Sequence, residues 1–236
     1  MKAKHTLIML VVLVLAVALA ACSSGAATST STPGETTVSE TAVATQSVPG
    51  APPDGGMGGD PSGGAMTVDT GTGAYILADG EEVSGGTYTS TNADENAIRA
   101  EGDSTALLDG VTVEKTDGAA SSSDASSFYG LNSAILALDN ATLTITGGTV
   151  TATAEGANGV FAYDGATIYI TDTVIDVSGG NAGGIEVAGG GTMVATNLTV
   201  NATIKAAIRS DRGGGTLTVD GGTYTTSGSS GAPAIY

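Results

Sequence analysis

The sequence predicts an all-β fold, a right-handed parallel β-helix of about six coils over residues 72–236. Two segments of nearly the same sequence, TLTITGGTVTAT from Thr142 and TLTVDGGTYTTS from Thr216, lie 74 positions apart. Beyond Gly71, apolar residues alternate with threonines and show no 3.6-residue period. Repeated strand units of this kind bury a continuous core by stacking on one another, so the repeat favours a solenoid.

Residues 1–21 are predicted to be a lipoprotein signal peptide. Lys2 and Lys4 precede an apolar run from Leu7 to Ala21, which is short for a membrane-spanning helix. The junction LAAC ends at Cys22, the only cysteine, and resembles the lipobox of bacterial lipoproteins, whose cysteine is lipidated. We therefore expect a lipid anchor at Cys22 and an extracytoplasmic location in the bacterial cell envelope. The alternative is an ordinary signal peptide with an incidental thiol.

Residues 22–71 are predicted to form a disordered linker that carries the anchor. This part is rich in Ser, Thr, Pro, Gly and Ala and contains few large apolar side chains. Such a composition buries too little surface to offset the entropy cost of ordering the chain. We expect a flexible spacer between the anchor and the folded domain.

Five repeat units can be aligned on their first threonine, and each unit of about 25 residues holds three short strands. The aligned residues are Thr105, Thr142, Thr167, Thr192 and Thr216. Positions one, three and eight residues later are apolar or nearly so, as a stacked core requires. The first interval is 37 residues long, and its extra residues, Thr116 to Phe128, predict a loop at one corner. A β-sandwich is the competing fold, but it would not explain five units in one register. A partial coil is expected from Thr72.

Two turns recur in each unit, at residue types that tolerate a left-handed backbone. The first turn falls at Gly110, Gly147, Asp172, Asn197 and Gly221. The second falls at Asp103, Asn140, Gly165, Gly190 and Gly214. The three strands of each coil are therefore expected to be separated by sharp bends.

These coils resemble a widespread group of secreted, adhesin-like bacterial proteins with a right-handed parallel β-helix. The segments that carry the resemblance are SSFYGLNSAILA (126–137), GANGVFAYDGAT (156–167), AIRSDRGGGTLTVDGGTYTTSG (207–228) and GAPAIY (231–236). The resemblance implies the fold and a surface location, and it transfers no catalytic signature. Members of the group continue for several more coils, whereas this sequence ends at Tyr236, so we expect the domain to be incomplete at its C-terminus.

The composition excludes several classes of function. After residue 21 the chain has five basic and 24 acidic residues, a formal charge of −19, so nucleic acid is not an expected partner. The only histidine, His5, lies in the signal. Without histidine or a free cysteine, the mature chain lacks the residues of Ser-His-Asp triads, Cys nucleophiles and most zinc sites.

One column of outward-facing residues is the candidate binding surface. It is predicted to contain Leu77, Arg99, Leu136, Phe161, Glu186, Arg209 and Tyr236. Exposed Leu136 and Phe161 beside Arg99 would stack against a sugar or a partner protein. The loop that ends with Phe128 and Tyr129 either contributes to this surface or covers it. Glu186 and Arg209 are expected to form a surface ion pair.

A calcium site is a second candidate. Asp139 and Asp164 occupy equivalent turns of adjacent coils, so their carboxylates are expected to lie close together. Stacked carboxylates repel one another unless a cation such as Ca²⁺ bridges them or water screens them. The alternative is that aspartate simply suits these turns.

The sequence therefore predicts a cell-surface lipoprotein with an adhesin-like, non-enzymatic β-helix. The expected ligand is a polysaccharide or another surface, and the expected membrane contact is the lipid at Cys22. The alternatives are a Ca²⁺-dependent carbohydrate-binding protein and a truncated polysaccharide lyase, because the fold resembles that of pectate lyases. Interrupted threonine arrays make binding to ice a weaker hypothesis.

Overall fold

The computed structural model describes residues 68–228 and 232–236. The predicted signal peptide, Cys22 and nearly all of the predicted linker lie outside the described residues. In the described ranges, no helix is long and apolar enough to cross a membrane.

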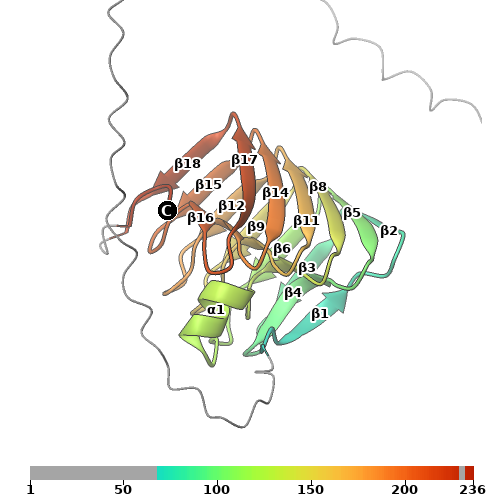
Figure 1. Ribbon diagram of the computed structural model, residues 1–236, viewed down its shortest axis with the longest axis horizontal. Coiled ribbons are helices and arrows are strands. Elements are labelled where there is room, and N and C mark those ends of the chain that lie inside the picture. Colours follow the sequence, from blue (N-terminus) through green and yellow to red (C-terminus); the bar gives the residue numbers. More distant parts are fainter. Residues whose placement is uncertain (1–67, 229–231) are drawn as a thin grey trace, which may run out of the picture. The chain divides into compact units, whose positions relative to one another are not determined.

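The described chain folds into a parallel β-solenoid of six coils, as the sequence predicts (Figure 1). Its three walls are six-stranded sheets, which we name A, B and C. Sheet A contains β1 (Thr72–Ile76), β4 (Glu95–Ala100), β7 (Ile135–Ala137), β10 (Val160–Ala162), β13 (Ile185–Val187) and β16 (Ile208–Ser210). Sheet B contains β2 (Glu81–Ser84), β5 (Thr105–Asp109), β8 (Thr142–Thr146), β11 (Thr167–Thr171), β14 (Gly191–Thr196) and β17 (Gly215–Asp220). Sheet C contains β3 (Thr87–Ser90), β6 (Thr112–Lys115), β9 (Thr149–Ala152), β12 (Val174–Val177), β15 (Thr199–Ala202) and β18 (Thr223–Thr226).

The register of sheet B confirms the alignment of the repeats. Its pairings connect Thr105, Thr142, Thr167, Thr192 and Thr216 in one row across neighbouring strands. The next residues along the chain point inward, and Leu143, Ile168 and Met193 among them are fully buried. The two similar twelve-residue segments thus form the strands of sheets B and C in coil three and in coil six. Coil one has all three strands and is complete, not partial as expected from the sequence.

The recurring turns have the predicted backbone, with one shift in position. Gly110, Gly147, Asp172, Asn197 and Gly221 have positive φ angles of 62°, 61°, 53°, 53° and 66°. In the second column, Asn140, Gly165, Gly190 and Gly214 also have positive φ, but the prediction for Asp103 was wrong. There Gly102 takes the left-handed conformation, because a glycine has no Cβ to clash with the backbone.

The long interval between coils two and three contains a folded insert, which we define as residues 116–133. The sequence predicted only a loop, whereas the insert includes helix α1 (Ser123–Tyr129), which lies outside the stack of coils (Figure 1). The Ser122 hydroxyl caps the helix by accepting a hydrogen bond from the Ala125 backbone N–H, at 3.1 Å. Gly130 ends the helix in a left-handed conformation, with φ of 76°.

Candidate functional site

The outward column on sheet A has the predicted members except at its start. Its strand pairings connect Ile76, Arg99, Leu136, Phe161, Glu186 and Arg209. The bridge between Ile208 and Ile235 places Tyr236 next in the row. Ile76, and not Leu77, begins the column, because strand β1 ends at Ile76 and Leu77 turns into the core.

The middle of the column is covered by the insert. Leu136 and Phe161 are fully buried and pack with Leu138, Ala188 and Tyr163 in a small second core outside sheet A. The expectation that Leu136 and Phe161 are exposed was therefore wrong. The alternative, in which the loop covers both residues, is confirmed. A Cβ added to Gly130 would lie only 2.5 Å from Leu136 Cδ1, which shows how closely the insert approaches the sheet.

Polar contacts fasten the insert along the corner between sheets C and A. The Ser126 hydroxyl donates to the Gly156 carbonyl at 2.7 Å, and the Asn158 amide donates to the Ser126 carbonyl at 2.9 Å. At coil six, Lys205 Nζ donates to Ser127 Oγ at 2.7 Å. The insert therefore reaches from coil two, where it leaves the solenoid, to the corner that precedes β16.

Arg99 is held by internal contacts at the N-terminal end of the column. It donates from Nη1 and Nη2 to the carbonyl and hydroxyl of Thr70, both at 2.9 Å, and it pairs through Nε with Glu101. A further contact joins Nη1 to Asn96 Oδ1 at 3.3 Å. This arginine fastens the segment before β1 to coil two, and its predicted contact with a ligand stays a prediction.

Lys115 is also occupied internally. Its side chain is fully buried, and Nζ donates to the backbone carbonyls of Asn92 and Asp117 and to the Ser90 hydroxyl. Burial lowers the pKa of the Lys115 ammonium group, against the opposing effect of nearby carboxylates. As with Arg99, acceptors within the chain bind the charged group of Lys115, so its burial needs no ligand.

Three aromatic rings meet at the end of the insert. Phe128 and Tyr129 have ring centroids 6.4 Å apart, and Tyr129 and Tyr163 have centroids 5.5 Å apart, both in edge-to-face arrangements. Arg212, in the turn after β16, lies with its guanidinium carbon 4.1 Å from the centroid of Phe128. All three rings are partly exposed.

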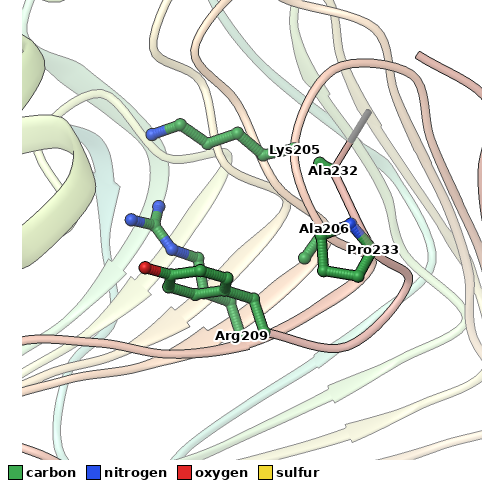
Figure 2. A pocket seen from close by; sticks show the side chains of 6 residues that line it. Lys205, Ala206, Arg209, Ala232 and Pro233 are labelled. Atoms are coloured by element: carbon green, nitrogen blue, oxygen red, sulfur yellow. The ribbon is translucent and has the colours of Figure 1, made fainter. Parts of the chain in front are cut away.

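A pocket of about 220 Å³ lies at coil six, where Lys205 bonds to Ser127 of the insert. It is lined by Lys205, Ala206, Arg209, Ala232, Pro233 and Tyr236. Figure 2 shows the charged ends of Lys205 and Arg209 on the same side of the pocket, away from Pro233. Tyr236 is 70% exposed, and the Arg209 guanidinium carbon lies 5.7 Å from the centroid of its ring. The pocket thus combines apolar walls, an aromatic ring and two cationic groups.

Glu186 is fully buried and pairs in register with Arg209, which lines this pocket. Its Oε1 is 3.5 Å from Arg209 Nη1, and neither carboxyl oxygen has a hydrogen-bond partner among the described residues. Desolvation raises the pKa of Glu186 to about 8; Arg209 and Lys205 oppose this shift, and Asp211 adds to it. The predicted pair with Arg209 is present, but it does not lie at the surface, because the Glu186 carboxyl group is fully buried.

We define the aromatic–cationic face as Phe128, Tyr129, Tyr163, Lys205, Arg209, Arg212 and Tyr236. Of the residues predicted for binding, Phe128 and Tyr129 belong to it, whereas Arg99, Leu136 and Phe161 do not. Sequence reasoning missed Tyr163 as a partner of Tyr129 and Lys205 as a partner of Ser127 in the insert. The available signal was the crowding of Lys205, Arg209 and Arg212 within eight positions of an otherwise acidic chain.

The two predicted calcium ligands lie in neighbouring turns of the solenoid. Asp139 and Asp164 are exposed, with φ angles of 55° and 51°, and the Asn140 N–H donates to the Asp164 carbonyl at 3.0 Å. Within the described ranges, no group of three or more His, Cys, Asp or Glu side chains is placed to hold a metal ion. Calcium binding by Asp139 and Asp164 stays a prediction.

Comparison of this chain with protein-family models, with curated proteins and with solved structures finds no match. The resemblances to bacterial lipoproteins and to adhesin-like proteins therefore stay predictions from the sequence.

Proposed function

We propose that this protein is an adhesin-like lipoprotein of the bacterial cell surface, which binds a saccharide through its aromatic–cationic face and catalyses no reaction. The observation that carries the proposal is the gathering of aromatic rings on this face. The sequence has two Phe and seven Tyr, and four of these nine residues belong to the face. Partly exposed rings beside a small pocket offer apolar surface and polar groups together, which suits the mixed character of a sugar.

The solenoid supports this role by holding the face rigidly. Of the pocket residues, Lys205 precedes β16 and Arg209 lies within it. Strand β16 pairs with β13 and so continues sheet A. Phe128 and Tyr129 come from the insert, which is fastened to the same coil through the bond between Lys205 and Ser127. A ligand would therefore meet side chains from two distant parts of the sequence without a large rearrangement.

The proposal is tested with the chain from residue 22, carrying Cys22→Ser so that no lipid is attached. Retention on a panel of insoluble polysaccharides is compared for this chain and for the variants Tyr236→Ala and Phe128→Ala. Loss of one stacking ring is expected to weaken binding by about tenfold. Tyr169→Ala is the matched control, because Tyr169 is 47% exposed on the outer side of sheet B, away from the face.

Three outcomes would contradict the proposal. If no polysaccharide retains the chain, saccharide binding is wrong. If Tyr236→Ala and Tyr169→Ala weaken retention equally, the aromatic–cationic face is not the binding site. Release of unsaturated oligosaccharides during the incubation would identify a polysaccharide lyase. Retention that is lost in EDTA would instead favour the Ca²⁺-dependent alternative and direct attention to Asp139 and Asp164.

A further inference from the structure

The positive charge of the described chain is unevenly distributed. Its basic residues are Arg99, Lys115, Lys205, Arg209 and Arg212, and the last three belong to the aromatic–cationic face. Arg99 and Lys115 are buried and surrounded by acceptors from the chain itself. The remaining three cations are therefore concentrated on one face of a strongly acidic protein; Arg212 is exposed, Lys205 is partly exposed, and the Arg209 side chain is 11% exposed.

These cations are only partly balanced by their neighbours. Arg209 pairs with Asp211 through Nη2, and Glu155 acts on Lys205 from the corner before β10. Among the described residues, Lys205 Nζ forms its hydrogen bond with a neutral hydroxyl, that of Ser127. Arg212 stacks on the ring of Phe128. Setting Lys205, Arg209 and Arg212 against Asp211 and Glu155 leaves one positive charge in excess among these five groups while Glu186 is protonated. Asp164 acts on Tyr163, which does not line the pocket.

The charge state of Glu186 enters this balance, because its Oε1 lies 3.5 Å from Arg209 Nη1. The charged groups that face it are Arg209 on β16, Lys205 before that strand and Asp211 after it. On its other side Glu186 pairs with Phe161, which brings no charge. A protonated Glu186 leaves the excess positive charge in place, and an ionised Glu186 cancels it.

We infer that the aromatic–cationic face selects a saccharide that carries a carboxylate, and that Glu186 is the residue that sets this specificity. The carboxylate would meet Lys205 and Arg209 at the polar end of the pocket, where charge-assisted hydrogen bonds are strong. The sugar ring would lie against Tyr236. This inference rests on the proposed function, because it names the ligand class of the same face.

The proton linkage gives the inference a distinctive signature. Burial holds the pKa of Glu186 near 8, so the carboxyl group is neutral below that pH and becomes charged above it. Affinity for an anionic sugar should therefore fall as the pH rises through about 8, whereas affinity for a neutral sugar should not. The pKa of Lys205 is lowered by burial and by Arg209, so its loss of charge would act in the same direction.

The experiment uses two probes, short β-linked oligomers of glucuronic acid and oligomers of glucose with the same length and linkage. Their binding to the Cys22→Ser chain is measured by calorimetry from about pH 6 to about pH 9 at low ionic strength. The acidic oligomer is expected to bind at least about tenfold more tightly at the lower pH. This preference should shrink severalfold toward the higher pH.

Glu186→Gln separates the two titrating groups. The glutamine imitates the protonated carboxyl group, so this variant should keep the preference for the acidic oligomer up to the higher pH. Glu114→Gln, on the outer side of sheet C, should behave like the parent chain. Thermal unfolding of each variant verifies that it is folded.

Each result has one meaning. Equal binding of the acidic and neutral oligomers would overturn the inference and leave saccharide binding intact. A Glu186→Gln variant that loses its preference over the same pH range would overturn the role of Glu186 and assign the titration to Lys205. If neither oligomer binds but another neutral polysaccharide does, carboxylate selection is wrong and the proposed function stands. If nothing in the wider panel binds, both proposals are wrong.

Discussion

Arg99 and Arg209 stand in the same outward column of sheet A, yet their surroundings differ. Arg99 is bonded to Thr70, Asn96 and Glu101, which bring acceptors to each side of its guanidinium group. Arg209 has Asp211 on one side and, on the other, the buried carboxyl group of Glu186, whose oxygens accept no hydrogen bond from the described residues. Position in the repeat therefore fixes the row in which each arginine stands, whereas the acceptors around the guanidinium group differ between the two ends of the column.

The largest expected effect is that of Glu186→Gln at high pH. The folded-state pKa of Glu186 is raised from 4.5 to about 8, so the folded protein holds this proton more tightly than the unfolded chain. The parent chain should lose stability as the pH rises from about 4.5 to about 8, and the loss should then level off. At about pH 9 the variant should be more stable by on the order of 4 kcal/mol. Urea unfolding at several pH values measures this difference, and a gap that does not change with pH would contradict the assignment.

Removal of each arginine should separate the two ends of the column. Arg99→Met deletes several charge-assisted hydrogen bonds and leaves the Thr70 carbonyl unpaired, so we expect a loss of about 3 kcal/mol in the free energy of unfolding. Arg209→Met should cost only about 1 kcal/mol, because a protonated Glu186 needs no counter-charge. Urea unfolding at about pH 6 compares them. Equal losses in the free energy of unfolding would show that both arginines stabilise the fold to the same extent.

The packing of the insert over Leu136 and Phe161 should depend on Gly130. Gly130→Ala combines a positive φ with a Cβ that approaches Leu136, and it should destabilise the protein by about 2 kcal/mol. Gly147→Ala is the control, because its φ is also positive and a Cβ there would meet no atom within 4 Å. That control should cost about 1 kcal/mol. Hydrogen exchange should show faster opening of α1 in Gly130→Ala alone.

The smallest effect is expected outside the column, at the turns of sheet A. Asp139→Asn should change stability by less than about 0.5 kcal/mol, because asparagine also tolerates a left-handed backbone. Thermal unfolding with Ca²⁺ and with EDTA verifies this for the single variant and for Asp139→Asn with Asp164→Asn. A Ca²⁺-dependent rise in melting temperature that disappears in the double variant would establish the calcium site.

The periodic part of the fold was accessible from the sequence. Threonines such as Thr142 and Thr216 define a register that each pair of neighbouring coils repeats, so a local pattern determines the pairing of distant strands. The same pattern could not show whether Phe161 is exposed, because its cover comes from an insert that the repeat does not contain. Helix α1 has seven residues, and its sequence SDASSFY shows no helical period.

The candidate site depended on contacts that no repeat encodes. Lys205 and Ser127 are 78 positions apart, and only the path of the insert brings them together. Glu186 looked like half of a surface ion pair, since its column faces outward. In the structure Glu186 is fully buried, and the charged groups that act on it, Lys205, Arg209 and Asp211, lie in or beside the next strand of sheet A.

The insert changes how this solenoid should come apart. In a simple stack each coil touches only its neighbours, so the end coils fray and unfolding advances one coil at a time. Here the Ser121 N–H bonds Asp94, in the corner between coils one and two, and the following helix reaches Lys205, in the corner between coils five and six. These bonds tie the first of these corners to the last, so the loss of one end weakens the other. The domain should therefore unfold as a single cooperative unit, although it is built from repeated coils.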